Sequence, residues 1–169
     1  MQKKITSDFL NLLEYLAKAD VDFVIVGGFA GIVHGCTYVT QDMDICCNFS
    51  AANLLKLQKA LSRLDPVHRM TPNKKKLELT EENCGQFKNL YLDTDIGQLD
   101  CLDVIEGVGD YEKVKQNSII IEVDDVKYHV LSIDALIKAK KAMNRPHDKE
   151  AVRQLESIKK LKDRCVQEQ

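Results

Sequence analysis

The chain has few prolines, no long hydrophobic run and no large excess of either charge. Its 169 residues include 3 prolines, 44% apolar and 30% charged residues, which is typical of a soluble globular protein with a buried core. No stretch approaches the roughly 18 consecutive apolar residues that a membrane-crossing helix requires. The N-terminal Met-Gln-Lys-Lys leads into a charged amphipathic segment instead of an apolar signal core. We therefore expect a cytoplasmic protein with no membrane contact.

The sequence also lacks the spacings of a zinc site. Its 6 cysteines include no Cys-x-x-Cys pair, and no histidine lies at a zinc-ligand spacing from any of them. Cys46, Cys47 and Cys101 lie within apolar runs, where a reduced cysteine behaves as a small hydrophobic side chain. This distribution is typical of structural cysteines in a reducing compartment.

The net charge of -2 argues against binding of duplex DNA by bulk electrostatics. The charge is unevenly distributed, however. Residues 135 to 169 carry 10 Lys/Arg and 5 Asp/Glu, whereas residues 1 to 134 carry 14 and 21. A solvated helical face explains such a bias, and so does a cation-binding acidic part beside a phosphate-binding basic part.

Hydrophobic periodicity predicts one α/β domain without repeats or flexible linkers. The predicted helices cover residues 4–19, 29–35, 50–64, 110–117, 132–144 and 148–162. The predicted strands cover residues 23–26, 39–48, 88–95, 97–105, 119–123 and 126–131, with short edge strands between 67 and 87. We expect a core of residues 1–131 and a C-terminal helical hairpin, residues 132–169, packed beside it in a single compact unit.

Glycine-rich signatures of nucleotide binding are missing, but one glycine pair stands out. The chain contains neither Gly-x-Gly-x-x-Gly nor Gly-x-x-x-x-Gly-Lys-Ser/Thr, which disfavours dinucleotide-binding and P-loop functions. Gly27-Gly28 directly follows the apolar run of residues 23–26. Glycine after a buried strand lets the backbone approach a ligand closely, often a phosphate. By itself the pair fits both a tight turn and a phosphate cradle.

Two aspartates interrupt the apolar, cysteine-rich strand that follows. Asp42 and Asp44 lie at positions i and i+2, so both side chains project from the same face of the strand. Like charges on one strand face are unfavourable unless a cation is shared between them. The alternative is an ordinary solvent-facing alternation, but aspartate is a poor strand former.

A third aspartate occurs in a similar apolar setting. Asp100 lies between Leu99 and Cys101, and a neighbouring strand could bring it to Asp42 and Asp44. Asp103 is the rival third ligand, but its spacing places it on the opposite face from Asp100. Three such carboxylates suit hard cations, and Mg²⁺, or Mn²⁺ in its place, would form a two-metal site.

Together these features resemble a known family. The Gly-Gly turn after a strand, Thr40-x-Asp42-x-Asp44 and the later Gly97-x-Leu-Asp100-x-Leu resemble the nucleotidyltransferase fold of the DNA polymerase beta superfamily. The tail pattern Leu136-Ile-x-x-Lys140-x-Ala-x-x-Arg145-Pro-x-Asp148 is similar to the C-terminal signature of small bacterial AbiEii abortive-infection toxins. The resemblance covers residues 8–160 and implies a mixed, twisted β-sheet flanked by helices, with a C-terminal helical hairpin.

The resemblance also implies roles for individual residues. The nucleotide would be bound by Gly27, Gly28, Thr40, Lys140 and Arg145. The catalytic metal ligands would be Asp42, Asp44 and Asp100, of which Asp100 also helps to activate the acceptor. Many superfamily members have Gly-Ser at the turn where this chain has Gly27-Gly28, so a phosphate-binding hydroxyl is absent there.

The implied activity is a Mg²⁺-dependent transfer of a nucleoside monophosphate from an NTP to an acceptor hydroxyl, with release of pyrophosphate. The sequence leaves the acceptor open among RNA or tRNA, a protein and a small molecule. It also leaves open a role as the toxin of a toxin-antitoxin or abortive-infection system, with a cognate antitoxin or a second copy of the chain as partner. The alternative function is a non-catalytic binding or regulatory module on the same fold.

Overall fold

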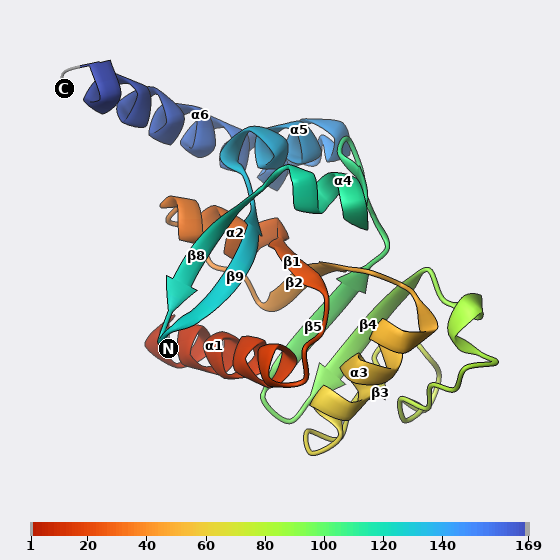
Figure 1. The fold of residues 1–169 in the computed structure, drawn as a ribbon. Helices are drawn as coiled ribbons and strands as arrows, with labels where there is room; N and C mark the ends of the chain where they lie inside the picture. The colour runs from red at the N-terminus through yellow and green to blue at the C-terminus, as the bar shows by residue number, and fades with distance from the viewer. Residues whose placement is uncertain (1, 168–169) are drawn as a thin grey trace.

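The computed structural model describes residues 2–167, with side chains from residue 8 onward, and is built around one seven-stranded mixed sheet (Figure 1). In spatial order the strands are β3 (Val67–His68), β4 (Asn89–Thr94), β5 (Gly97–Leu102), β2 (Asp42–Cys47), β1 (Phe23–Val26), β9 (Val126–Leu131) and β8 (Ser118–Val123). The helices are α1 (Gln2–Lys18), α2 (Gly27–His34), α3 (Ala51–Leu61), α4 (Tyr111–Gln116), α5 (Ile133–Met143), α6 (Pro146–Gln167) and the 3-10 turn η1 (Cys84–Gln86).

The helices pack on this sheet in two groups. α1 packs against α3, and α2 packs against α5 and α6. Figure 1 shows α5 and α6 together at one end of the molecule, with the last part of α6 running out beyond the rest of the fold. Among residues 2–167, no helix combines the length and the hydropathy that a membrane crossing needs.

The central strands have the alternation that the sequence predicts. In β2, Met43 and Ile45 are fully buried, whereas Asp42 and Asp44 are partly exposed on the other face. β2 pairs antiparallel with β1 and parallel with β5, and this second pairing sets Asp44 directly opposite Asp100. The sheet therefore carries carboxylates from two distant parts of the sequence on one face at its centre.

Helix ends are fixed by local hydrogen bonds. The side chains of Ser50, Asp110 and Ser132 accept hydrogen bonds from the backbone N–H three residues later and begin α3, α4 and α5. Gly35 ends α2 in the left-handed conformation, with φ of 113°. The predicted helix starts at Ser50 and Ser132 and the predicted end at Gly35 are confirmed.

Several predicted boundaries differ from the structure: the strand predicted over 39–48 begins at Asp42, and the helix predicted over 29–35 begins at Gly27. The predicted strand 97–105 breaks at Asp103, because the next two residues form β6 (Val104–Ile105) and pair with β7 (Gly109–Asp110) in a separate small sheet. The last helix begins at Pro146, earlier than the predicted residue 148, and continues to Gln167. Proline suits the first position of a helix, where its missing N–H has no partner to lose.

A buried asparagine joins α3 to the sheet. Asn53 is 3% exposed, and its side-chain oxygen accepts a hydrogen bond from the Asp22 backbone N–H at 2.7 Å. Its amide nitrogen donates to the backbone carbonyls of Asp22 at 3.0 Å and Asn48 at 2.7 Å. One side chain thus satisfies backbone groups before β1 and after β2.

Replacing Asn53 with Ala should lower the free energy of unfolding by about 3 kcal/mol, because three partly buried backbone groups lose a hydrogen-bond partner. Urea denaturation measures the loss. Asn83→Ala is the matched control, since Asn83 makes similar hydrogen bonds to Thr80 and Glu78 in an exposed loop. We expect the control to lose less than about 1 kcal/mol, and equal losses would contradict a stabilising role for the hydrogen bonds of Asn53.

Candidate active site

Three carboxylates meet on the central strands. One oxygen from each of Asp42, Asp44 and Asp100 lies within 4.8 Å of the other two. The parallel pairing of β2 with β5 causes this convergence, because it sets Asp44 opposite Asp100 and keeps Asp42 on the same face. Asp103 lies beyond the end of β5 and is not part of this group. The structure thus brings together the three aspartates that the sequence singled out.

The three carboxylates repel one another electrostatically. Burial, followed by the charges of Asp42 and Asp100, raises the pKa of Asp44 to about 7. Lys140 and a hydrogen bond from the Gly28 backbone N–H oppose this rise without cancelling it. Burial also raises the pKa of Asp100, against the opposing effect of Arg69. A bound cation would relieve this repulsion.

The cluster fits a hard divalent cation. Asp100 is 7% exposed, and its Oδ1 is buried without a hydrogen bond, although Arg69 Nη2 lies 2.7 Å away. The guanidinium donates its hydrogen bond to the other oxygen, Oδ2, at 3.0 Å. A buried carboxylate oxygen with unused acceptor capacity, beside two further carboxylates, is the donor set that Mg²⁺ and Mn²⁺ prefer.

The glycine turn closely approaches this cluster. Gly27 has φ of +63°, and a Cβ at this position would overlap Asp44 Oδ2, so both conformation and space require glycine. A Cβ on Gly28 would lie 2.8 Å from Thr40 Oγ1, which donates a hydrogen bond to the Asp42 carbonyl. Gly27 and Gly28 also form the first turn of α2, where the N-cap residue Val26 supplies no side-chain hydrogen bond.

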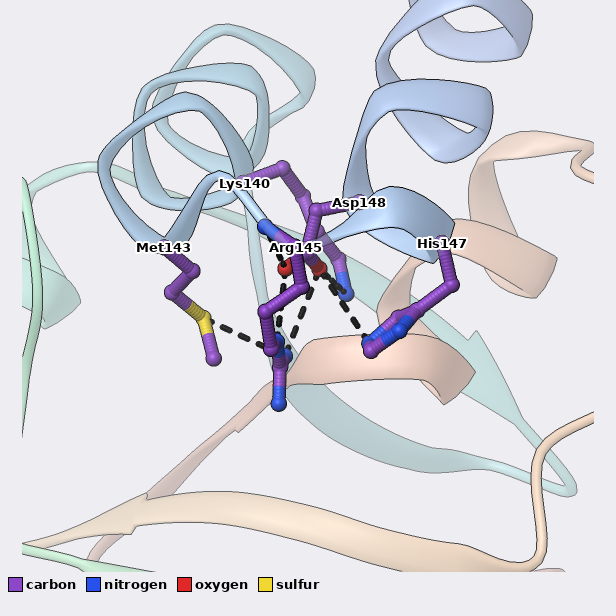
Figure 2. A network of polar contacts seen from close by, with 5 residues as sticks. All are labelled: Lys140, Met143, Arg145, His147 and Asp148. Carbon is purple, nitrogen blue, oxygen red and sulfur yellow. Dashed lines mark hydrogen bonds and ion pairs between the residues drawn. The ribbon is translucent and has the colours of Figure 1, made fainter.

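The second group of site residues comes from the α5–α6 hairpin, and Figure 2 shows Asp148 lying between Lys140 and Arg145. Asp148 is fully buried, and its Oδ1 accepts hydrogen bonds from Lys140 Nζ at 3.1 Å and Arg145 Nη2 at 3.3 Å. Its Oδ2 accepts from the Nε of Arg145 at 2.7 Å and from the backbone N–H of Arg145 at 3.2 Å. Burial alone would raise the pKa of Asp148, but these hydrogen bonds lower it to about 2.

A cleft of about 570 Å³ joins the two groups. Its lining includes all the predicted site residues: Gly27, Gly28, Thr40, Asp42, Asp44, Asp100, Lys140 and Arg145. One wall comes from the acidic part of the chain and the other from the basic part. The cleft therefore has one wall with three clustered carboxylates and another with two cations held in place by one buried carboxylate.

Sequence reasoning missed two side chains beside the cluster. Arg69 contacts Asp100 across 31 positions, and it lies in a polar stretch with no local pattern that could indicate this contact. Tyr91 lines the cleft and pairs across the hairpin with Asp100. A signal for Tyr91 was present, because the tight turn between residues 94 and 97 fixes the hairpin register.

Comparison of the sequence with protein-family models and with curated proteins gives no match. The antibiotic-resistance factor ANT(2'')-Ia, in a solution structure, is 14% identical over 99% of this chain and 94% of its own, with a TM-score of 0.57. The lincosamide antibiotic adenylyltransferase LnuA, with lincomycin bound, is 16% identical over 90% of this chain and 96% of its own, with a TM-score of 0.59. An antigenic nucleotidyltransferase-like protein from Paracoccidioides brasiliensis is 13% identical over 94% of this chain and 76% of its own, with a TM-score of 0.55.

At these identities the similarity establishes a shared fold. The mixed, twisted sheet flanked by helices, with its C-terminal helical hairpin, is the nucleotidyltransferase fold, and the predicted fold class is confirmed.

Asp148→Asn should lower the free energy of unfolding by about 3 kcal/mol at pH 7, because Lys140 would stay buried without a counter-charge. Urea unfolding of the two proteins measures the difference. The pKa of Asp148 is about 2 in the folded protein, below its ordinary value of 3.8. The stabilisation is therefore complete above the higher value, and the difference should shrink as the pH falls toward 2.

Asp134→Asn is the matched control for this prediction. Asp134 pairs with Lys159 on the surface, where its side chain is 65% exposed, so we expect a loss below about 1 kcal/mol. Equal losses in the two variants would contradict a special role for the buried carboxylate.

Asp44→Asn should raise the free energy of unfolding by about 2 kcal/mol in EDTA at neutral pH, because it removes one of three clustered negative charges. Millimolar Mn²⁺ should raise the melting temperature of the wild type but leave that of the variant unchanged. Thermal melts in the two buffers measure both effects. Asp95→Asn, at the exposed β4–β5 turn, should change neither. An Asp44→Asn variant less stable than the wild type in EDTA would count against charge repulsion.

Proposed function

We propose that the chain is a metal-dependent nucleotidyltransferase that moves a nucleoside monophosphate from an NTP to an acceptor hydroxyl and releases pyrophosphate. The observation that carries the proposal is the cluster of Asp42, Asp44 and Asp100 in a cleft whose opposite wall presents Lys140 and Arg145. The nucleotidyltransferase fold of the chain supports the same activity.

Asp42, Asp44 and Asp100 would hold the metal, which we propose to be Mg²⁺. When bound, Mg²⁺ neutralises charge on the triphosphate and activates the acceptor hydroxyl. Asp100 lies on β5 and the other two on the adjacent strand β2, so the three carboxylates project from one face of the sheet and converge at one point. Such convergence fixes reacting groups without movement of the protein, and positioning supplies much of the rate in phosphoryl-type transfers.

The Gly27-Gly28 turn would bind the phosphates through backbone N–H groups at the start of α2. Thr40 supports this role, because its hydroxyl lies where a side chain on residue 28 would project. We propose that Thr40 supplies the hydroxyl that other members of the superfamily carry on the turn itself. The hydroxyl that a Gly-Ser turn would carry at residue 28 is then supplied by residue 40 instead.

Lys140 and Arg145 would bind the remaining negative charge of the triphosphate. Lys140 is only 8% exposed, and its ammonium lies between the buried Asp148 and the cleft. A cation held in this way is already oriented before substrate binds, which favours electrostatic stabilisation in the transition state. Asp148 therefore acts as the positioning residue for both cations.

For the acceptor, we propose a small hydroxylated molecule. Support comes from LnuA, which was solved with lincomycin, and from a structure of ANT(2'')-Ia with adenylyl-2''-tobramycin. The tail pattern from Leu136 to Asp148 is similar to that of the AbiEii toxin group and supports a second candidate role, a toxin with a cognate antitoxin. In that role, RNA such as tRNA, or a protein, is the alternative acceptor.

One experiment tests both the activity and the acceptor. The protein is incubated with each labelled NTP, Mg²⁺ and cell extract, and RNA, protein and small molecules are then separated. We expect label in the small-molecule fraction, and label in RNA would favour the toxin. No label, together with no rise in melting temperature from Mg²⁺ and NTP, would instead indicate a non-catalytic binding module.

The double variant Asp42→Asn, Asp44→Asn should lose transfer by about 10³-fold or more, because two of the three metal ligands lose their charge. Circular dichroism checks that the variant keeps its fold. Asp95→Asn, an exposed carboxylate outside the cluster, is the control and should retain activity. Equal activity in the double variant and the control would exclude the proposed mechanism.

A further inference from the structure

Arg69 does not line the cleft, but it contacts the cluster of Asp42, Asp44 and Asp100 through Asp100. It follows the edge strand β3, and its Nη2 donates a hydrogen bond to Asp100 Oδ2 at 3.0 Å. Its side chain is 19% exposed and that of Asp100 is 10% exposed, so the pair is largely removed from water. None of the roles proposed above uses this arginine.

Several contacts hold the guanidinium in place. The Arg69 backbone N–H donates to the Tyr91 carbonyl at 2.8 Å, and Nη1 lies 3.5 Å from the Leu92 carbonyl. The guanidinium carbon also lies 5.8 Å from the centre of the Tyr91 ring, within range of a cation–π interaction. These contacts anchor the arginine to β4, the strand directly beside that of Asp100.

The two oxygens of Asp100 have different surroundings. Oδ2 accepts the hydrogen bond from Arg69, whereas the buried Oδ1 lies 2.7 Å from the same Nη2 in an ion pair but accepts no hydrogen bond. A hydrogen bond to one oxygen fixes the rotation of the carboxylate about its terminal bond. The other oxygen is then fixed as well and keeps its capacity to bind a cation.

We propose that Arg69 is a positioning residue for the three-carboxylate cluster. It holds Asp100 so that one of its oxygens stays available to a cation shared with Asp42 and Asp44. This inference rests on the metal site of the proposed function. Outer partners of metal-binding carboxylates typically alter metal affinity by about 10- to 100-fold when they are removed. Lysine cannot replace this arginine fully, because its ammonium lacks the planar fork of donors.

The test is a titration of the full-length protein with Mn²⁺ by calorimetry, without any nucleotide. Arg69→Gln should bind Mn²⁺ about 10-fold more weakly than the wild type, and Arg69→Lys should fall between the two. Lys74→Gln is the matched control, because Lys74 pairs with Asp93 on the same side of the sheet at 2.8 Å but outside the cluster. Its Mn²⁺ affinity should not change.

Melting temperatures in EDTA show whether each variant is folded. Should Arg69→Gln fail to fold, Arg69→Lys keeps the charge and still tests the loss of the planar fork. Unchanged Mn²⁺ affinity in the folded Arg69 variants would overturn the inference. Tighter binding would overturn it too, since Arg69 would then compete with the cation instead of positioning its ligand.

The same titration separates this inference from the proposed function. Weaker Mn²⁺ binding by the Arg69 variants, in a protein that transfers no nucleotide, would support the positioning role and refute the proposed activity. If the wild type transfers nucleotide but the Arg69 variants bind Mn²⁺ with unchanged affinity, the proposed activity is supported and the positioning role of Arg69 is refuted. A wild type that binds no Mn²⁺ would overturn both.

Discussion

The repulsion among three aspartates is the constraint on which the rest of the site depends. Asp42, Asp44 and Asp100 have oxygens within 4.8 Å of one another, and the fold compensates for this only in part. Arg69 offsets the charge on one side of the cluster, and Lys140 acts on Asp44 from the other. The charge that remains would favour a cation bound among the three carboxylates.

The basic wall follows a different principle, because its two cations share one buried carboxylate. Asp148 is buried and bonds both Lys140 and Arg145, so the two cations have fixed positions before any ligand arrives. The acidic wall thus contains carboxylates that repel one another, whereas the side chains of the basic wall are held in place by ion pairs. The uneven charge of the sequence, acidic before residue 135 and basic after it, corresponds to these two walls.

Much of this arrangement could be predicted from the sequence, since its signals are local. The i, i+2 spacing of Asp42 and Asp44 placed them on one strand face, and serine caps marked two helix starts. Arg69 could not be predicted, because its contact with Asp100 depends on how an edge strand pairs within the folded sheet. The break at Asp103 was missed for a similar reason, since Val104 and Ile105 pair with a two-residue strand that has no periodicity.

The parallel pairing of β2 with β5 also bears on the order of folding. β1 and β2 are connected through α2 and are close in sequence, so they can pair early, whereas β5 can pair with β2 only after the chain through Leu102 has been made. A nascent chain that ends before residue 100 therefore carries two of the three carboxylates and an unpaired edge on β2. Pairing of β5 with β2 and assembly of the acidic cluster are consequently one event, whereas β9 and β8, which complete the sheet beyond β1, come from later in the chain.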